Sequence, residues 1–149
     1  MNIPAQVQHE WERQNLAEQV KGKRIALGFG SRGVARIDEI AHEMVAMVKA
    51  SGGFPFIVPA MGSHGGATSD GQRAVLARYG ITEETMGCPI RSEMESVPLG
   101  DTDLDVGTFI ARAAWEADAV LIVNRVKPHT DFLGIRERGW TKRLPNELA

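Results

Sequence analysis

Hydrophobic residues in this chain form three short runs, separated by stretches in which they recur at helical spacing. The runs at 24–30, 54–58 and 119–123 have the length and composition of buried strands. Residues 119–123 are apolar without interruption, which is typical of a parallel strand covered on both faces. The prolines around 54–58 fit the ends of that strand better than its centre, because proline cannot donate to a ladder.

Two helices are expected between these strands. From Val34 onward, apolar residues recur at the spacing of one helix face, and Ser51-Gly-Gly53 should end that helix. Thr68 or Ser69 can cap the next helix, and Gly80 should stop it.

The remaining segments have weaker patterns. Residues 4–20 predict a lead-in helix that need not belong to the core, and Thr82 can cap one further helical turn. Residues 88–106 are polar and rich in turn formers, which favours two small strands around Gly100-Asp101. A helix is expected over 108–116.

The order of these elements predicts the fold class. A β-α-β-α series followed by α-β favours an α/β fold with a doubly wound, mostly parallel sheet. We therefore expect helices on both faces of the sheet, as in a partial Rossmann-like domain.

Composition excludes several classes of partner. The 149 residues carry 17 basic and 19 acidic side chains with no basic stripe, which argues against nucleic acid. The longest apolar stretch, 117–123, contains Asp118 and is far shorter than the ~20 residues of a membrane helix. The single cysteine, Cys88, cannot form an internal disulfide and has no motif around it, so we expect a small apolar filler. With no basic and apolar leader at the amino terminus, the sequence indicates a reduced, cytoplasmic protein.

Each predicted strand is followed by a loop that contains a charged or titratable side chain. Arg32 follows the first strand, His64 the second, and Arg125, Lys127 and His129 the third. Loops at the carboxyl ends of parallel strands share one edge, where ligands bind. Arginine matches a carboxylate or phosphate, and neutral histidine can take or give a proton near pH 7. The combination suits proton transfer beside a carboxylate.

The loop after the second strand also has the composition of an anion site. Gly62, Gly65 and Gly66 let backbone amides approach an anion, and Ser63 lies among them. The helix that begins near Ser69 points its positive end toward the same place. A phosphate-bearing cofactor is expected, although sulfate or carboxylate would fit as well.

These residues also have structural interpretations. His64 or His129 could satisfy turn backbone, and Arg32 taken alone could be a solvated turn residue. Their recurrence at equivalent strand ends favours function. His42 lies off the apolar face of its helix and His9 lies in a polar helix, so we assign no role to either.

Motif spacing argues against two other functions. Gly28-Phe-Gly-Ser-Arg-Gly33 matches the dinucleotide fingerprint, but the second strand runs into Pro59-Ala-Met-Gly62 and lacks the acidic residue that would bind ribose. An NAD enzyme is therefore disfavoured. A zinc hydrolase is disfavoured because no metal-ligating residues have the close spacing of a zinc site.

Three stretches together resemble the amino-terminal domain of the nickel-dependent lactate racemase family. They are Gly30-Ser-Arg-Gly33, Val58-Pro-Ala-Met-Gly-Ser-His-Gly-Gly-Ala-Thr68 and Asn124-Arg-Val-Lys-Pro-His-Thr-Asp-Phe132. The resemblance covers residues 23–142, and the second stretch is the most specific.

The resemblance implies an enzyme that inverts the hydroxyl-bearing carbon of a 2-hydroxy acid with a nickel-pincer nucleotide. In that family the cofactor accepts a hydride while one of two histidines removes the hydroxyl proton. His64 and His129 match those histidines, and Arg32 matches an anion-binding arginine. Lys142 is the candidate cofactor tether, although it lies further from His129 than in the founding enzymes. The family's nickel-binding histidine would lie beyond residue 149.

The chain departs from the family in length, since members are more than twice as long. Residues 1–22 form the lead-in, and residues 143–149 leave the family pattern. We therefore expect a truncated or frameshifted reading frame or an isolated domain, incomplete as a racemase. The alternative is a non-catalytic domain that binds phosphate or a nucleotide. A bare sheet edge would favour self-association.

Overall fold

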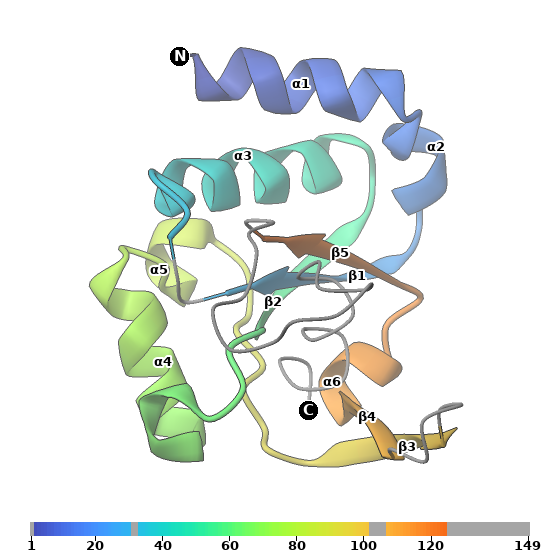
Figure 1. The fold of residues 1–149 in the computed structure, drawn as a ribbon. Coiled ribbons are helices and arrows are strands. Elements are labelled where there is room, and N and C mark those ends of the chain that lie inside the picture. The colour runs from blue at the N-terminus through green and yellow to red at the C-terminus, as the bar shows by residue number, and fades with distance from the viewer. Residues whose placement is uncertain (1, 31–32, 102–106, 125–149) are drawn as a thin grey trace, which may run out of the picture.

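The computed structural model describes residues 2–30, 33–101 and 107–124 (Figure 1). Helices and strands follow one another along the chain as α1 (Ile3–Arg13), α2 (Leu16–Val20), β1 (Arg24–Phe29), α3 (Ile37–Ala50), β2 (Phe54–Pro59), the 3-10 helix η1 (His64–Ala67), α4 (Ser69–Arg78), α5 (Glu83–Met86), β3 (Ser96–Asp101), β4 (Gly107–Ala111), α6 (Arg112–Trp115) and β5 (Ala119–Val123).

The three predicted strands form one parallel sheet in the order β2-β1-β5. Phe29 at the end of β1 pairs with Pro59 on one side and Val123 on the other, so the three strands end level. This confirms the predicted α/β fold with a parallel sheet. β1 is the central strand, and every residue after its first is buried.

One face of the sheet is covered by α3, which packs Ala41, Val45 and Val48 against Leu27 and Phe29. The helix begins at Ile37 rather than at Val34. It ends at Ala50 with Ser51 as its C-cap, as the Ser51-Gly-Gly53 segment predicted. Gly53 is required beyond it because a Cβ there would lie 2.8 Å from a Val48 side-chain carbon.

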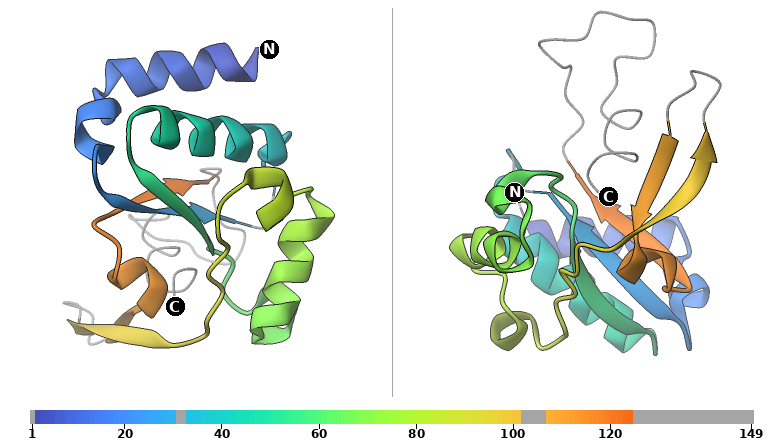
Figure 2. Two further views of the ribbon diagram at one scale, coloured as in Figure 1. Left: turned by 180° about the vertical axis from the view of Figure 1, so that it is seen from behind. Right: turned by 90° about the horizontal axis from the view of Figure 1, so that it is seen from below.

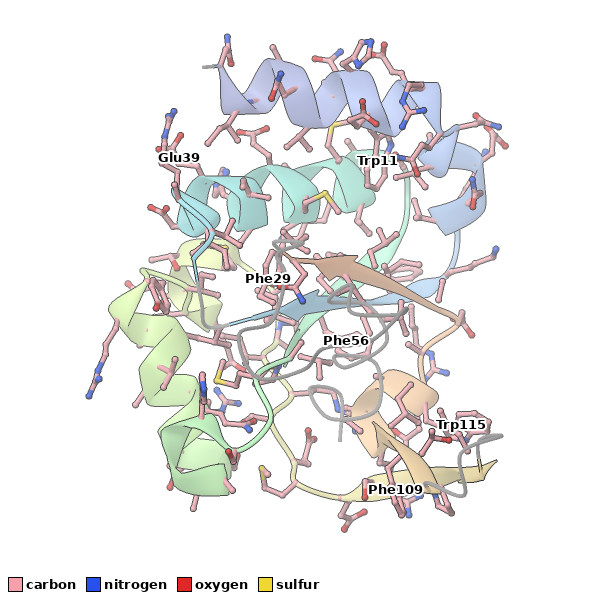
Figure 3. The ribbon with its side chains drawn as sticks, viewed as in Figure 1. Trp11, Phe29, Glu39, Phe56, Phe109 and Trp115 are labelled. Atoms are coloured by element: carbon pink, nitrogen blue, oxygen red, sulfur yellow. The ribbon has the colours of Figure 1, made fainter. Side chains whose placement is uncertain are left out.

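The lead-in helix α1 lies on the far side of α3 and forms a third layer (Figures 1 and 3). Trp11 is 3% exposed and packs in the same cluster as Val20 and the α3 residues. The lead-in segment therefore belongs to the core, which its polar sequence did not indicate.

The other face of the sheet carries a smaller cluster. Ala26, Phe56 and Val58 pack there with Ala113 and Ala114. The two alanines belong to the short helix α6, whose place in the fold is shown in Figure 2. Within the described residues, α6 is the helix on this face, and it is a single turn of four residues. The prediction of helices on both faces is therefore not confirmed.

The predicted helix over 108–116 is wrong in its first half. Residues 107–111 form β4, which pairs antiparallel with β3, and Val97 lies opposite Ile110. Thr108 and Ile110 are half-buried while Phe109 between them is exposed. This two-residue alternation of β-branched and aromatic residues is the pattern of a strand, and it outweighs the helix-forming alanines that follow.

The predicted helix caps are confirmed. The Thr68 hydroxyl accepts a hydrogen bond from the Gly71 amide at 3.1 Å, and Thr82 forms a reciprocal capping box with Thr85. These bonds satisfy amides that have no partner within the helix.

The outer edge of β5 has no ladder partner within the described ranges, and all five of its residues are only half-buried. Self-association through a bare sheet edge stays a prediction. No helix in the described ranges is long and apolar enough to cross a membrane.

We predict that Leu27→Ala lowers the free energy of unfolding by about 2–5 kcal/mol, because it leaves a cavity at a fully buried position in the central strand. Leu99→Ala is the matched control, since Leu99 is 50% exposed, and should cost less than about 1 kcal/mol. Urea denaturation measures both; equal losses would mean that β1 is not the centre of the core.

Candidate functional site

The candidate site lies at the carboxyl edge of the parallel sheet. β2 and β5 lie on opposite sides of β1, so the chain changes direction across the sheet at β1. Parallel sheets of this kind bind ligands in the crevice outside such a crossover point. The pairing of β1 with the β2 segment extends one residue beyond β2, since the Ala60 amide donates to the Phe29 carbonyl at 2.8 Å.

His64 is the one candidate acid/base residue within the described ranges. It begins η1 directly beyond β2 and is half-buried. The other candidates with charged or titratable side chains lie outside the described residues, and these are Arg32, Arg125, Lys127, His129 and Lys142. Their meeting with His64 in one crevice therefore stays a prediction.

The glycine loop around His64 has an unusual backbone. Gly62, Gly65, Gly66 and Ala67 all have positive φ, between 53° and 71°. A Cβ on Gly65 would lie 2.4 Å from the carbonyl carbon of Gly71, so this glycine is required by close packing on α4. A Cβ on Gly66 would meet nothing within 4 Å, so an external group can approach the loop there.

The loop is held on the first turns of α4 by side-chain hydrogen bonds. The Thr68 hydroxyl lies 3.1 Å from the Gly65 carbonyl, and the Gln72 amide nitrogen donates to the Gly62 carbonyl at 2.9 Å. Gln72 is 5% exposed, and the sequence analysis assigned it no role. Its partner Gly62 lies ten residues earlier in the chain, so no local pattern indicated the contact.

The positive end of α4 already has an acidic neighbour. Asp70 lies in the first turn, where a carboxylate complements the helix dipole. Ser63 is exposed in the preceding turn. An anion at this loop would therefore depend on the amides around Gly66 more than on the helix end, because Asp70 partly offsets the positive potential.

A polar cluster fixes α4 to the segment beside β2. The Arg73 guanidinium donates to the Ser92 hydroxyl at 3.1 Å and to the Ile90 carbonyl at 2.6 Å, and it pairs with Glu83 at 3.2 Å. The Ser69 and Ser92 hydroxyls lie 2.8 Å apart. A hydrogen bond from the Ile90 amide, and then one from Arg73, hold the pKa of Glu83 below its ordinary value.

The other histidines and the cysteine lie away from this edge. The side chains of His9 and His42 are 73% and 62% exposed, which confirms that they lie on the surface. Cys88 is buried in the core as expected, and burial raises the pKa of its thiol. Across the described part of the chain, no three His, Cys, Asp or Glu side chains lie close enough together to hold a metal ion.

No protein-family model matches the chain, and no curated protein matches it significantly. The site is therefore interpreted from its own residues and from the motif resemblance.

Gly65→Ala and Gly66→Ala form a matched pair at the same backbone conformation. We predict that Gly66→Ala costs about 1 kcal/mol of stability, from the left-handed backbone alone. Gly65→Ala should cost roughly 2–4 kcal/mol, because its Cβ also collides with the first turn of α4. Chemical denaturation distinguishes the two, and similar losses would contradict the close packing.

Glu83 should make stability depend on pH. Because its pKa is lowered in the folded protein, Glu83 stabilises the fold above its ordinary pKa of 4.5, and this contribution is lost as the pH falls through the lower folded value. The urea midpoint of the unmodified protein should therefore fall more steeply from about pH 5 to about pH 3 than that of Glu83→Gln. Glu84→Gln, an exposed neighbour in α5, should retain the steeper dependence.

Proposed function

We propose that this chain is the amino-terminal, cofactor-binding half of a racemase or epimerase acting on a 2-hydroxy acid. The observation that supports it most is that three parallel strands end level, with β2 and β5 on either side of the crossover strand β1. His64 follows one of these strands and His129 follows another along the chain. Acid/base groups on two different strands suit transfer of the hydroxyl proton of either mirror-image substrate. Inversion also requires that the hydride on the same carbon leave and return from the other face, and the cofactor implied by the resemblance would accept it.

The proposed roles follow from side-chain chemistry. A neutral imidazole, from His64 or His129, accepts the hydroxyl proton of the substrate at its unprotonated ring nitrogen. The other histidine, as imidazolium, returns a proton when the mirror-image product forms. Arg32 binds the substrate carboxylate through its planar fork of donors, while Arg125 and Lys127 add positive charge.

The cofactor enters the proposal through the resemblance alone. The described residues do not supply a set of nickel donors, and Lys142 lies outside them. We therefore assign only proton transfer and carboxylate binding to the chain's own residues. The open side of Gly66 supports a narrower proposal, that the loop takes a phosphate or carboxylate group through its amides.

The proposed compartment is the cytoplasm. Cys88 is buried and unpaired in the core, as is usual for a thiol in a reducing environment.

The test is racemisation of a single enantiomer of lactate by protein purified from its natural source, followed by chiral chromatography. His64→Ala and His129→Ala should each lower the rate by about a hundredfold or more, because each removes a general acid/base group. His42→Ala is the matched control and should retain full activity, since its side chain is exposed on α3.

Cofactor retention, followed by absorbance and metal content, separates catalysis from binding. Both variants should keep any cofactor that the unmodified protein carries. Undiminished racemisation in either variant would reject the two-base assignment. If the natural protein binds phosphate or a nucleotide without turning over 2-hydroxy acids, the alternative of a non-catalytic anion-binding domain would replace this proposal.

A further inference from the structure

A groove of about 460 Å³ lies at the amino end of the parallel sheet, on the edge opposite the candidate site. Its walls come from Arg24 at the start of β1, from residues 53–56 at the start of β2, and from residues 87–89 with Arg91. The volume falls within the range of small-molecule sites. The groove shares no residue with the glycine loop after β2.

The groove exists because two prolines interrupt a ladder. On the outer edge of β2, Ile57 donates to the Pro89 carbonyl and accepts from the Arg91 amide, each at 2.8 Å. Continued toward the amino end, this parallel ladder would need a Pro55 N–H for the Gly87 carbonyl and a Pro89 N–H for the Pro55 carbonyl. Neither proline has an N–H, so the two segments cannot pair beyond this point.

Lys49 takes the place of the missing donor. Its ammonium group, from the end of α3, donates to the Gly87 carbonyl at 2.5 Å. The lysine is thereby held in the wall of the groove, and two of its three donors remain available for another acceptor.

Lys49 is the cation of the groove that an anion can reach. Arg24, Lys49 and Arg91 line the groove, and no lining residue is acidic. The two arginines are balanced by carboxylates outside it, since Arg24 lies 3.6 Å from Asp118 and Arg91 lies 3.1 Å from both Glu93 and Glu116. Lys49 donates to a carbonyl, which does not neutralise its charge.

The remaining walls are apolar and aromatic. Phe54 is 63% exposed although it opens an otherwise buried strand. The Arg91 guanidinium lies 5.7 Å from the centre of the Phe56 ring, whose other contacts are in the core (Figure 3 shows Phe56 on the sheet). Pro55 and Pro89 add flat apolar surface. Such walls favour a flat apolar body attached to the anionic group.

We propose that this groove binds a small aromatic anion, with the anionic group on Lys49 and the ring against Phe54 and the two prolines. The site is independent of the proposed racemase chemistry, because it lies at the other end of the strands.

The experiment is a ¹H–¹⁵N chemical-shift titration of the whole chain with naphthalene-2-sulfonate. Saturable shifts are expected at the amides of Phe54, Phe56, Gly87, Cys88 and Arg91. Lys49→Met should weaken binding about tenfold, because it removes one charge-assisted hydrogen bond to the anion. Lys49→Arg keeps a charged donor and should largely preserve the affinity. Arg78→Met, which removes an exposed cation on α4, is the matched control and should bind normally.

Neutral naphthalene-2-sulfonamide tests the role of charge and should bind much more weakly. Equal binding of the two probes, unchanged affinity in Lys49→Met, or shifts centred on the loop at 62–66 would each overturn the proposal. Phe54→Ser supplies a second variant whose folding is not at risk, because the ring is mostly exposed. It should also weaken binding, and an unchanged affinity would reject the aromatic contact.

Discussion

The structure depends on the burial of β1 between two parallel neighbours. Both backbone edges of this strand are paired, one with β2 and the other with β5, and its side chains supply apolar surface to both faces. A strand in this position needs apolar residues on both sides, which Ile25, Ala26 and Leu27 provide. The helices above the sheet and the loops at its ends take their positions from this strand.

The two ends of the sheet differ because glycines shape the loop at one end and prolines interrupt strand pairing at the other. At the carboxyl end, the loop after β2 turns back on α4 through Gly65 and Gly71, whose backbones touch. At the amino end, Pro55 and Pro89 stop a ladder and leave a groove. In both places the effect is on the backbone. Glycine lets two backbone segments approach closely, and proline removes an N–H donor from the ladder.

The carboxyl end is the edge at which open α/β sheets bind ligands, and His64 lies there on a loop that hydrogen bonds hold before and after it in the chain. Gln72 and Thr68 hold that loop without themselves being reactive groups. Such support suits the acid/base role proposed for His64, because proton transfer requires the donor and acceptor to be held within hydrogen-bond reach.

The sequence by itself determined the three strands, the order of the main helices, the caps at Thr68 and Thr82, and the loop that carries His64. These features depend on local periodicity and on the conformational limits of glycine, proline and capping residues, which act over a few positions. Tertiary structure decided the rest. The polar lead-in helix belongs to the core because Trp11 packs against α3. Residues 107–111 form a strand because they pair with Val97 and its neighbours in β3. The roles of Gln72 and Lys49 likewise depend on partners 10 and 38 residues away along the chain, whose approach no local pattern encodes.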